Sequence, residues 1–519
     1  MRDLLIGIDA GTSVIKSIAF DLAGQQIAAA AVPNTYDTRP DGSATQPLDR
    51  TWSDCAETLR KLAEKVPDLA GRTAAIGVTG QGDGTWLIDR AGRPVGDGWL
   101  WLDARSAGTV RTLRAGEADR VRFETTGTGL NSCQQGAQLA HMCIRLPHLL
   151  DGAVTALHCK DWLYFRLTGE RVTDPSEACF TFGDFRTRSY ADDVIAALGL
   201  AHLRALLPPI LDGVDTTHPL GAEAAADTGL RAGTPVALGY VDVVCTALGA
   251  GLVTDGLEAG CTIVGSTGMH MRATPPDGVR LDGEATGYVM ALPLPGLVAQ
   301  LQSNMAGTIN IDWILKLAAE LMSDMGRPVT HSELIDHTDD WIAATPPAGL
   351  IFQPYISEAG ERGPFVHNDA RAGFVGLNTG HRFPHLVRAV FEGLAMAARD
   401  CYAAMGPIPS EVRLSGGAAR SRELRAIFAA SLGRPVRCSS REEAGAAGAA
   451  MIAAVATGVY RTMPDCIADW VTPYLTNAEE PDEALSRRYD ALYPPYRHAR
   501  EALVPVWEAL ARKEDTGHA

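Results

Sequence analysis

The stretch Ile6–Asp21 constrains the fold of this chain more than any other. Apolar residues run up to Asp9, a short break containing glycine follows, and a second run rich in β-branched residues completes the stretch. Two apolar runs separated by such a break predict a β-hairpin. The tip of this hairpin carries Gly11, Thr12 and Ser13.

The hairpin tip has the chemistry of a phosphate site. Gly11 has no Cβ and lets backbone approach a ligand, while Thr12 and Ser13 add hydroxyls, and successive N–H groups form an anion-binding nest. Asp9 is a hard oxygen ligand suited to hydrated Mg²⁺, and Lys16 adds positive charge nearby. The alternative is an ordinary glycine turn with Asp9 as a turn cap.

Length and charge limit the function classes. A chain of 519 residues is too long for one core, so two or more domains are expected. The formal net charge is −16, and no run of Lys and Arg could neutralise a phosphate backbone. Nucleic acid is therefore not an expected partner. Because the overall field opposes an anionic substrate, a neutral substrate is favoured.

Nothing in the chain predicts a leader or a membrane partner. Only residues 4–8 form an apolar run before Asp9, far short of a signal peptide or a membrane span. The run 444–456 is rich in Ala and Gly and has polar flanks, which predicts a tightly packed helix. The ten cysteines show no zinc or redox spacing, which favours reduced thiols and a cytoplasmic protein.

A glycine-rich loop follows a short buried strand that we predict at residues 74–79. The loop reads Gly80-Gln81-Gly82-Asp83-Gly84. Because α/β proteins place ligand loops where buried strands end, Gln81 and Asp83 are candidate substrate-binding residues.

A second candidate wall is the segment 99–105, which carries Trp101, Asp103 and Arg105. Such a group can hold a sugar or polyol, because C–H faces pack on indole and hydroxyls pair with charged groups. The alternative is a core tryptophan beside a surface ion pair.

Asp242 lies at a predicted junction between a strand and a helix. Residues 234–240 are strand-like, and residues 243–249 open a helix. Asp242 either caps this helix or aims its carboxylate into a cleft, where it could act as a base.

The second half of the chain repeats the opening pattern. Glycines between residues 249 and 260 mark the boundary, and strand-like residues 261–264 lead into the turn Gly265-Ser266-Thr267-Gly268. A second strand-like run follows, so this is a second small-residue hairpin. Two such hairpins facing across a cleft would hold a polyphosphate from both sides.

A further glycine turn, with Gly416, Gly417 and Ala418, follows a predicted strand at residues 412–415. A helix from about residue 421 to 432 comes next. The chain contains no Gly-x4-Gly-Lys-Ser/Thr string, so it is not a P-loop protein.

Together these stretches resemble the FGGY family of carbohydrate kinases, within the superfamily of actin, hexokinase and heat-shock chaperones. The match covers nearly the whole chain in the same order. Two longer strings make it specific: Lys160-Asp161-Trp162-Leu163 with Leu167-Thr168-Gly169 resembles the first family signature, and residues 372–377 with 385–392 resemble the second. Residues 360–364 look like another family landmark.

The resemblance implies an α/β fold with two domains, the actin/hexokinase-like (ribonuclease H-like) arrangement of mixed sheets flanked by helices. The domains would close over ATP and a small polyhydroxy substrate in an interdomain cleft. Residues 1–249 would form the N-terminal domain with the substrate site and first phosphate motif. Residues 250–519 would form the C-terminal domain with the second phosphate and adenosine motifs.

The resemblance also assigns roles. Asp242 falls where the family keeps its catalytic base, and Asp9 falls beside the Mg²⁺ that accompanies ATP. The nucleotide-binding positions implied are Asp9, Gly11, Thr12, Ser13 and Lys16 in the first motif, Gly265, Ser266, Thr267 and Gly268 in the second, and Gly416, Gly417 and Ala418 at the adenosine.

The substrate prediction depends on the loop at Gly82-Asp83. Xylulose kinases carry Met-His at this place and glycerol kinases carry Arg-Glu. A carboxylate at Asp83 can accept bonds from two neighbouring hydroxyls, and Gly82 in place of arginine predicts room for at least one more carbon. With Trp101, Asp103 and Arg105 as the opposite wall, the prediction is a four-carbon sugar alcohol, erythritol. A five-carbon ketose or polyol is the alternative.

Two other classes stay open at this stage. Actin-like and chaperone-like ATPases of the superfamily bind nucleotide without phosphorylating a small molecule, and a catalytically silent regulator is a third reading. Asp242 and the polyol loops at Asp83 and Asp103 argue against the mechanical ATPase. The silent regulator is disfavoured because none of the expected catalytic positions is missing. The expected partners are a small polyol and ATP, and a homodimer is one possible assembly.

Overall fold

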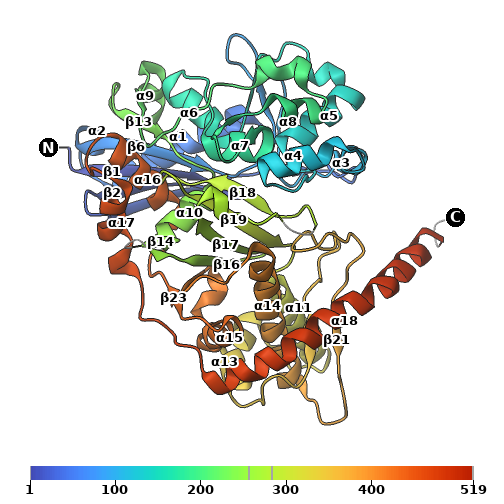
Figure 1. Cartoon of the computed structure of the whole chain (residues 1–519). Helices are drawn as coiled ribbons and strands as arrows, with labels where there is room; N and C mark the ends of the chain where they lie inside the picture. The colour runs from blue at the N-terminus through green and yellow to red at the C-terminus, as the bar shows by residue number, and fades with distance from the viewer. Residues whose placement is uncertain (1, 255–256, 282–283, 517–519) are drawn as a thin grey trace.

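The computed structural model describes residues 2–254, 257–281 and 284–516, which form two lobes (Figure 1). Each lobe is built on a six-stranded mixed sheet flanked by helices. The first sheet has the order β12 (Thr217–Pro219), β13 (Pro235–Leu238), β6 (Thr73–Gly80), β1 (Leu4–Ala10), β2 (Val14–Asp21), β3 (Gln26–Pro33). The second has the order β18 (Tyr288–Ala291), β19 (Val298–Asn304), β17 (Gly268–Thr274), β16 (Gly260–Val264), β22 (Val412–Ser415), β23 (Val436–Cys438). The predicted two-lobed α/β fold is confirmed.

The two sheets repeat one topology. In the first, β1, β2 and β3 are antiparallel neighbours, and β6 and β13 then run parallel to β1. In the second, β16, β17 and β19 are antiparallel neighbours, and β22 and β23 run parallel to β16. Both predicted hairpins are present. Each supplies the first two strands of its sheet in chain order. The ends of the parallel strands, where such sheets hold ligands, therefore form one edge in each lobe.

Shorter strands and the helices complete the lobes. The shorter strands are β4 (Asp37–Thr38), β5 (Ala44–Gln46), β7 (Trp86–Ile88), β8 (Gly98–Trp99), β9 (Thr155–Leu157), β10 (Gly183–Asp184), β11 (Ser189–Tyr190), β14 (Val253–Thr254), β15 (Leu257–Glu258), β20 (Ile351–Gln353) and β21 (Gly373–Val375). The helices before residue 251 are α1 (Leu48–Lys65), α2 (Leu69–Arg72), α3 (Ala107–Arg114), α4 (Ala118–Thr126), α5 (Gln135–Arg145), α6 (Cys159–Thr168), α7 (Pro175–Phe182), α8 (Asp192–Ala197), α9 (Ala222–Thr228) and α10 (Asp242–Ala250). Those after it are α11 (Ile309–Asp324), α12 (His331–Asp336), α13 (Thr338–Ala343), α14 (Phe383–Met405), α15 (Arg422–Leu432), α16 (Ala444–Ala456), α17 (Met463–Trp470) and α18 (Glu483–Thr516). Within the described ranges, no helix has both the length and the apolar character needed to cross a membrane.

Helix α16 packs directly on the first sheet because both surfaces lack side-chain bulk. A Cβ at Gly7 in β1 would overlap the carbonyl oxygen of Ala446, and one at Gly77 in β6 would overlap that of Ala449. The helix consists almost wholly of alanine and glycine, which lets its backbone reach the strands. The predicted tightly packed helix is confirmed, and it packs against β1, the strand that carries Asp9.

The chain returns from the second lobe to the first near its end. Helices α16 and α17 lie beside β1 and β2 in Figure 1, although they follow the second sheet in sequence. The Trp470 ring of α17 packs 5.2 Å from that of Phe20, and its Nε1 donates to the Leu22 carbonyl over 3.1 Å. The division at residue 249 stays a prediction, and segment 444–470 contacts the sheet on the other side of that division.

Candidate active site

Both hairpin tips line a single cavity of about 200 Å³. Thr12 comes from the β1–β2 tip and Thr267 from the β16–β17 tip. The same cavity is lined by Asp83, Trp101 and Asp242. Its other lining residues are Gly82, Phe180, Val241, Val243, Met269, Tyr288, Met290, Ser303 and Arg362. Pockets that hold drug-sized ligands measure about 300 to 1,000 Å³, so this cavity suits a smaller ligand.

Asp242 is the first residue of α10 and faces this cavity. Burial and the nearby negative charge of Asp9 raise the pKa of its carboxyl to about 7, although a hydrogen bond from the Val243 N–H over 2.7 Å opposes the rise. The helix cap itself is Val241. A carboxylate with a pKa near neutrality is well suited to accept a proton.

Asp9 lies at the end of β1, directly across the hairpin from Lys16. Burial raises the pKa of the Asp9 carboxyl to about 6, with Lys16 lowering it and Glu443 raising it. The Lys16 ammonium pairs with Glu443 over 2.9 Å. A Cβ at Gly445 would lie 2.5 Å from Asp9 Oδ2, so the first turn of α16 faces the carboxylate.

The residues present fit a magnesium ion that arrives with a nucleotide. Mg²⁺ in such sites is held by one or two carboxylates together with phosphate oxygens and waters. The described residues contain no group of three or more His, Cys, Asp or Glu that could hold a metal by themselves. Asp9 is a single desolvated carboxylate, so it matches a site in which one carboxylate holds Mg²⁺ together with phosphate oxygens and waters.

Asp83 presents an unsatisfied acceptor at the cavity. Its Oδ1 is buried without a hydrogen-bond partner, and its backbone has a φ of 57°, an unusual value for a residue other than glycine. Burial raises the pKa of the carboxyl, while Cys133, His158 and Arg362 lower it in part. A hydroxyl of a bound polyol would supply the missing donor.

Gln81 supports the first hairpin tip from behind. The Trp101 Nε1 donates to the Thr12 hydroxyl over 2.8 Å, and that hydroxyl donates to Gln81 Oε1 over 2.9 Å. The Gln81 amide in turn donates to Gln46 over 3.0 Å. Gln81 is buried and is not among the lining residues. It fixes the position of Thr12 and Trp101.

Asp103 and Arg105 also lie outside the lining of this cavity. The Asp103 carboxylate is buried, accepts from the Ala44 N–H over 2.9 Å and pairs with Arg105 over 2.6 Å. The Arg105 guanidinium stacks 3.4 Å from the centre of the Trp99 ring. These contacts brace the segment that carries Trp101, and direct substrate binding by the pair stays a prediction.

Gly82 packs closely against Val241 and Glu177. A Cβ at Gly82 would overlap Val241 Cγ2 and would lie 3.2 Å from Glu177 Oε1. A side chain therefore could not project from position 82 in this conformation. The expectation that glycine here leaves room for another carbon stays a prediction.

Three polar lining residues were not assigned a role from the sequence: Arg362, Ser303 and Tyr288. The Arg362 guanidinium donates to the Ser303 hydroxyl over 2.9 Å. Arg362 belongs to the stretch 360–364, whose resemblance to a family landmark was the available signal. Ser303 and Tyr288 lie in β19 and β18, where no local motif marks them.

The second tip and the predicted adenosine motif lie at neighbouring strand ends. Strands β16 and β22 pair with Ile263 opposite Ser415, so the turns that follow them are adjacent. Gly416 has a φ of 94° and packs against the Val264 carbonyl, leaving no room for a side chain. A Cβ at Gly417 would meet no atom within 4 Å, and Ala418 is half-buried. Neither the turn at 416–418 nor Gly11, Ser13, Lys16, Gly265, Ser266 and Gly268 lines the small cavity.

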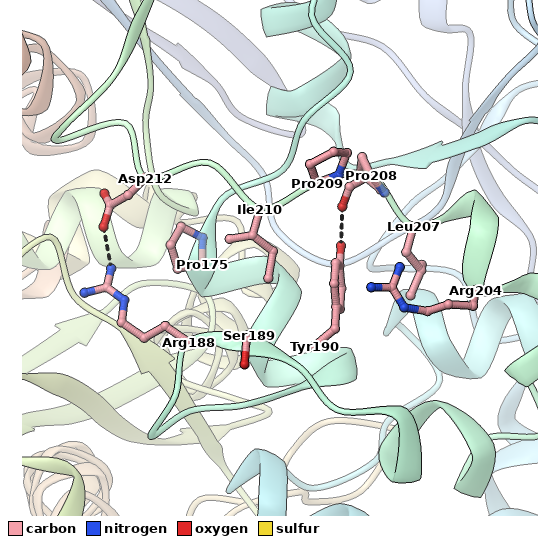
Figure 2. Close-up of a pocket in the computed structure, with 10 residues that line it drawn as sticks. All are labelled: Pro175, Arg188, Ser189, Tyr190, Arg204, Leu207, Pro208, Pro209, Ile210 and Asp212. Atoms are coloured by element: carbon pink, nitrogen blue, oxygen red, sulfur yellow. Dashed lines mark hydrogen bonds and ion pairs between the residues drawn. The ribbon is translucent and has the colours of Figure 1, made fainter.

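A larger cavity of about 710 Å³ lies elsewhere on the first lobe (Figure 2). At this cavity Arg188 pairs with Asp212 over 2.9 Å, and the Tyr190 hydroxyl donates to the Pro208 carbonyl over 2.8 Å, as Figure 2 shows. Neither hairpin tip nor Asp242 reaches it. The smaller cavity therefore holds the chemistry.

Two sheets of like topology, whose hairpin tips meet the Asp242 carboxylate at one cavity, define a phosphotransferase of the actin/hexokinase-like class. The chain belongs to the FGGY family of carbohydrate kinases. The family's N-terminal domain matches residues 4–249, and its C-terminal domain matches residues 260–457.

Individual relatives agree with this assignment. The chain is 62% identical over 509 residues to the erythritol kinase of Brucella abortus (strain 2308), covering 98% of each chain. It is 26% identical to the L-xylulose/3-keto-L-gulonate kinase of Escherichia coli (strain K12), covering 97% of this chain and 98% of that one. Its structure is similar to that of xylulose kinase from Rhodospirillum rubrum, with a TM-score of 0.87 and 27% identity, covering 97% of this chain and all of the other.

Proposed function

We propose that this kinase transfers the γ-phosphoryl group of ATP to a terminal hydroxyl of erythritol, with Asp242 as general base. The observation that carries the proposal is that Asp242 shares one cavity with both hairpin tips and with Asp83. The 62% identity to an erythritol kinase supports the choice of substrate. A pentulose is the second candidate, favoured by the structural similarity to a xylulose kinase.

Asp242 acts on the attacking hydroxyl. Its carboxylate takes the hydroxyl proton as the oxygen attacks the γ-phosphorus, which contributes about 10²- to 10⁴-fold in rate. The hairpin tips that carry Thr12 and Thr267 line the cavity. Backbone N–H groups of these tips stabilise the charge on the transferring phosphoryl group. Mg²⁺ held by Asp9 would supply further charge stabilisation on the phosphates. Closure of the lobes would exclude water as a competing acceptor.

The cavity wall accounts for a small polyol. Asp83 supplies a buried acceptor for hydroxyls, and Trp101 supplies an apolar face for the carbon chain. The cavity volume of about 200 Å³ is small, which favours a four-carbon over a five-carbon substrate.

Activity is expected to fall as pH decreases through the pKa of Asp242. Only the ionised carboxylate accepts a proton, and burial with Asp9 nearby raises its pKa to about 7. Below this value kcat/KM should decrease by roughly tenfold per pH unit. A pH profile of kcat/KM for the polyol checks this, and a flat profile down to pH 5 would contradict it.

Replacing Asp83 by alanine should raise KM for the polyol at least about tenfold, because a hydrogen bond to a charged group is lost. KM for ATP should change little, since Asp83 lies on the polyol side of the cavity. Steady-state kinetics with each substrate varied in turn tests the prediction. Equal increases in both KM values would mean that the loop has a structural role only.

Replacing Gly417 by valine should weaken nucleotide binding by roughly tenfold, because the side chain would project into the space assigned to adenosine. The fold should tolerate it, since a Cβ there meets nothing within 4 Å. Titration with ATP gives the Kd, and Gly349→Val, at another open glycine, is the matched control. An unchanged Kd would place the adenosine elsewhere.

The experiment that tests the proposed reaction is product analysis. The protein, Mg²⁺, ATP and erythritol are incubated together, and ³¹P NMR follows the phosphorus. A phosphomonoester on a terminal carbon, formed with an equal amount of ADP, is expected. Inorganic phosphate with no ester would instead indicate an actin-like ATPase. Light scattering of the same sample would test the predicted homodimer.

A further inference from the structure

We propose that Ser176 is a positioning residue that fixes the Tyr240–Val241 peptide group, which directly precedes the catalytic Asp242. The inference rests on the proposed function, because it assumes that Asp242 is the base. Ser176 is fully buried in α7 and is not among the residues that line the cavity. It therefore acts through Asp242 and does not touch the substrate.

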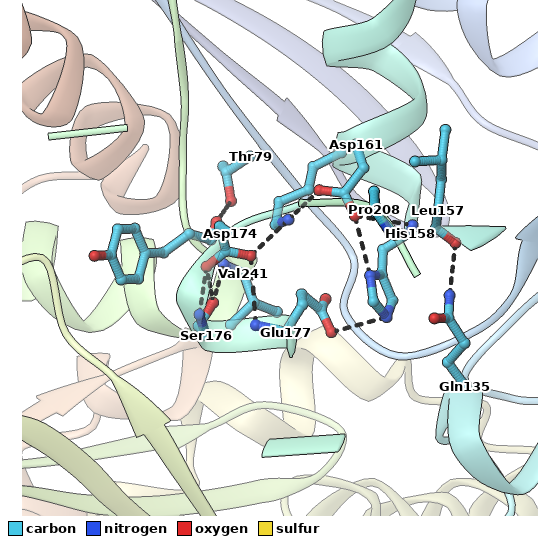
Figure 3. Close-up of polar contacts among 12 residues, drawn as sticks. Thr79, Gln135, Leu157, His158, Asp161, Asp174, Ser176, Glu177, Pro208 and Val241 are labelled. Carbon is cyan, nitrogen blue, oxygen red and sulfur yellow. Dashed lines mark hydrogen bonds and ion pairs between the residues drawn. The ribbon is translucent and has the colours of Figure 1, made fainter. Parts of the chain in front are cut away.

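The Ser176 hydroxyl is shared between two partners, as Figure 3 shows. Its Oγ accepts a hydrogen bond from the Val241 N–H over 3.1 Å, and it donates its own proton to the Asp174 carboxylate. Because the proton is directed to Asp174, a lone pair of the oxygen is left for Val241. Val241 immediately precedes Asp242, so this bond sets where α10 begins.

Buried charges hold Asp174 in turn. Asp174 caps α7 by accepting from the N–H groups of Ser176 and Glu177, and the Lys160 ammonium lies 2.6 Å from the oxygen that accepts from Glu177. Lys160 also pairs with Asp161 over 2.5 Å, and all three charged side chains are fully buried. These contacts fix the orientation of the Asp174 carboxylate and, through it, the direction of the Ser176 hydroxyl. This gives a role to the lysine of the first family-like signature.

The same peptide is held from its other side by β6. The Thr79 hydroxyl donates to the Tyr240 carbonyl over 2.6 Å. One residue earlier, a Cβ at Gly239 would lie 2.5 Å from the Val78 carbonyl oxygen, so backbone packs on backbone. The link between β13 and α10 is thus fixed on both faces, and Ser176 supplies the contact on the α7 face.

The test is Ser176→Ala, with Thr181→Val as matched control. Thr181 lies in the same helix, and its buried hydroxyl has no hydrogen-bond partner. Ser176→Ala should lower kcat at least about tenfold while KM for ATP changes less than about twofold, because misplacing a catalytic group affects the transition state. The control should keep kcat. Ser176→Cys, which keeps the volume but accepts hydrogen bonds weakly, replaces the alanine variant if that variant does not fold.

The same change made in Asp242→Asn separates this inference from the proposed function. If Ser176 acts through Asp242, Ser176→Ala should have no further effect on the residual rate of Asp242→Asn. A multiplied loss in the double variant, or a Ser176→Ala enzyme as active as the control, would overturn the inference and leave the proposed function standing. An Asp242→Asn enzyme with normal turnover would overturn both.

Discussion

Replacing Asp242 by asparagine is expected to lower kcat at least about 100-fold while the binding of ATP and polyol is largely kept. Asparagine preserves the size of the side chain but cannot accept the hydroxyl proton. The raised pKa of Asp242, about 7, is the physical reason to expect a large effect, because the native group is a strong enough base at neutral pH.

Single-turnover kinetics with ligand titration measures the two effects separately. If Asp242→Asn lost affinity for both ligands and little else, Asp242 would be a structural residue at the start of α10. Near-normal turnover would remove it from the role of base altogether. The Asp242→Asn enzyme is also expected to lose the acidic limb of the pH profile.

Replacing Gly77 by alanine is expected to destabilise the protein by about 3 kcal/mol or more. A Cβ at this position would overlap the carbonyl group of Ala449, which is backbone and cannot rotate away. Helix α16 would have to move off β6, and with it the turn that faces Asp9. The denaturant midpoint, followed by circular dichroism, measures the loss.

Gly96→Ala is the matched control, because a Cβ at Gly96 meets nothing within 4 Å. Its midpoint should stay close to that of the native protein. If Gly77→Ala were equally well tolerated, the contact between α16 and the first sheet would be looser than described. The activity that Gly77→Ala retains would show how strongly the position of Asp9 depends on the contact between α16 and the first sheet.

Local sequence was sufficient to predict the hairpins and the positions at strand ends. Runs of buried residues that stop at a glycine turn specify both the strand and the place where it ends, so Thr12 and Thr267 could be placed on tips. Asp242 was predicted at a strand-to-helix junction for the same reason. The structure adds that these positions, far apart in the chain, line one cavity.

Packing between distant segments could not be predicted. The space beside Gly82 is closed by Val241 and Glu177, whose positions depend on α7 and α10. Arg362 and Tyr288 reach the cavity from the second lobe, and no local pattern marks their orientation. The engagement of Asp103 by Arg105 and Ala44 likewise depends on tertiary contacts.

The return of the chain to the first lobe could not be predicted from the sequence either. The alanine and glycine content of α16 predicted close packing but not the partner, which is the sheet formed by the first residues of the chain. A single boundary at residue 249 therefore separates the sequence motifs of the two halves, but the contacts of α16 with the first sheet cross it.

The most direct test of polyol phosphorylation measures ADP release with Mg·ATP across erythritol, glycerol, xylitol, ribitol, D-xylulose and L-xylulose, with a control lacking any acceptor. The highest kcat/KM is expected on erythritol, with no release in the control. Preference for a pentulose would contradict the assignment of a four-carbon substrate and keep the mechanism. ATP turnover that is indifferent to every acceptor would contradict kinase activity itself.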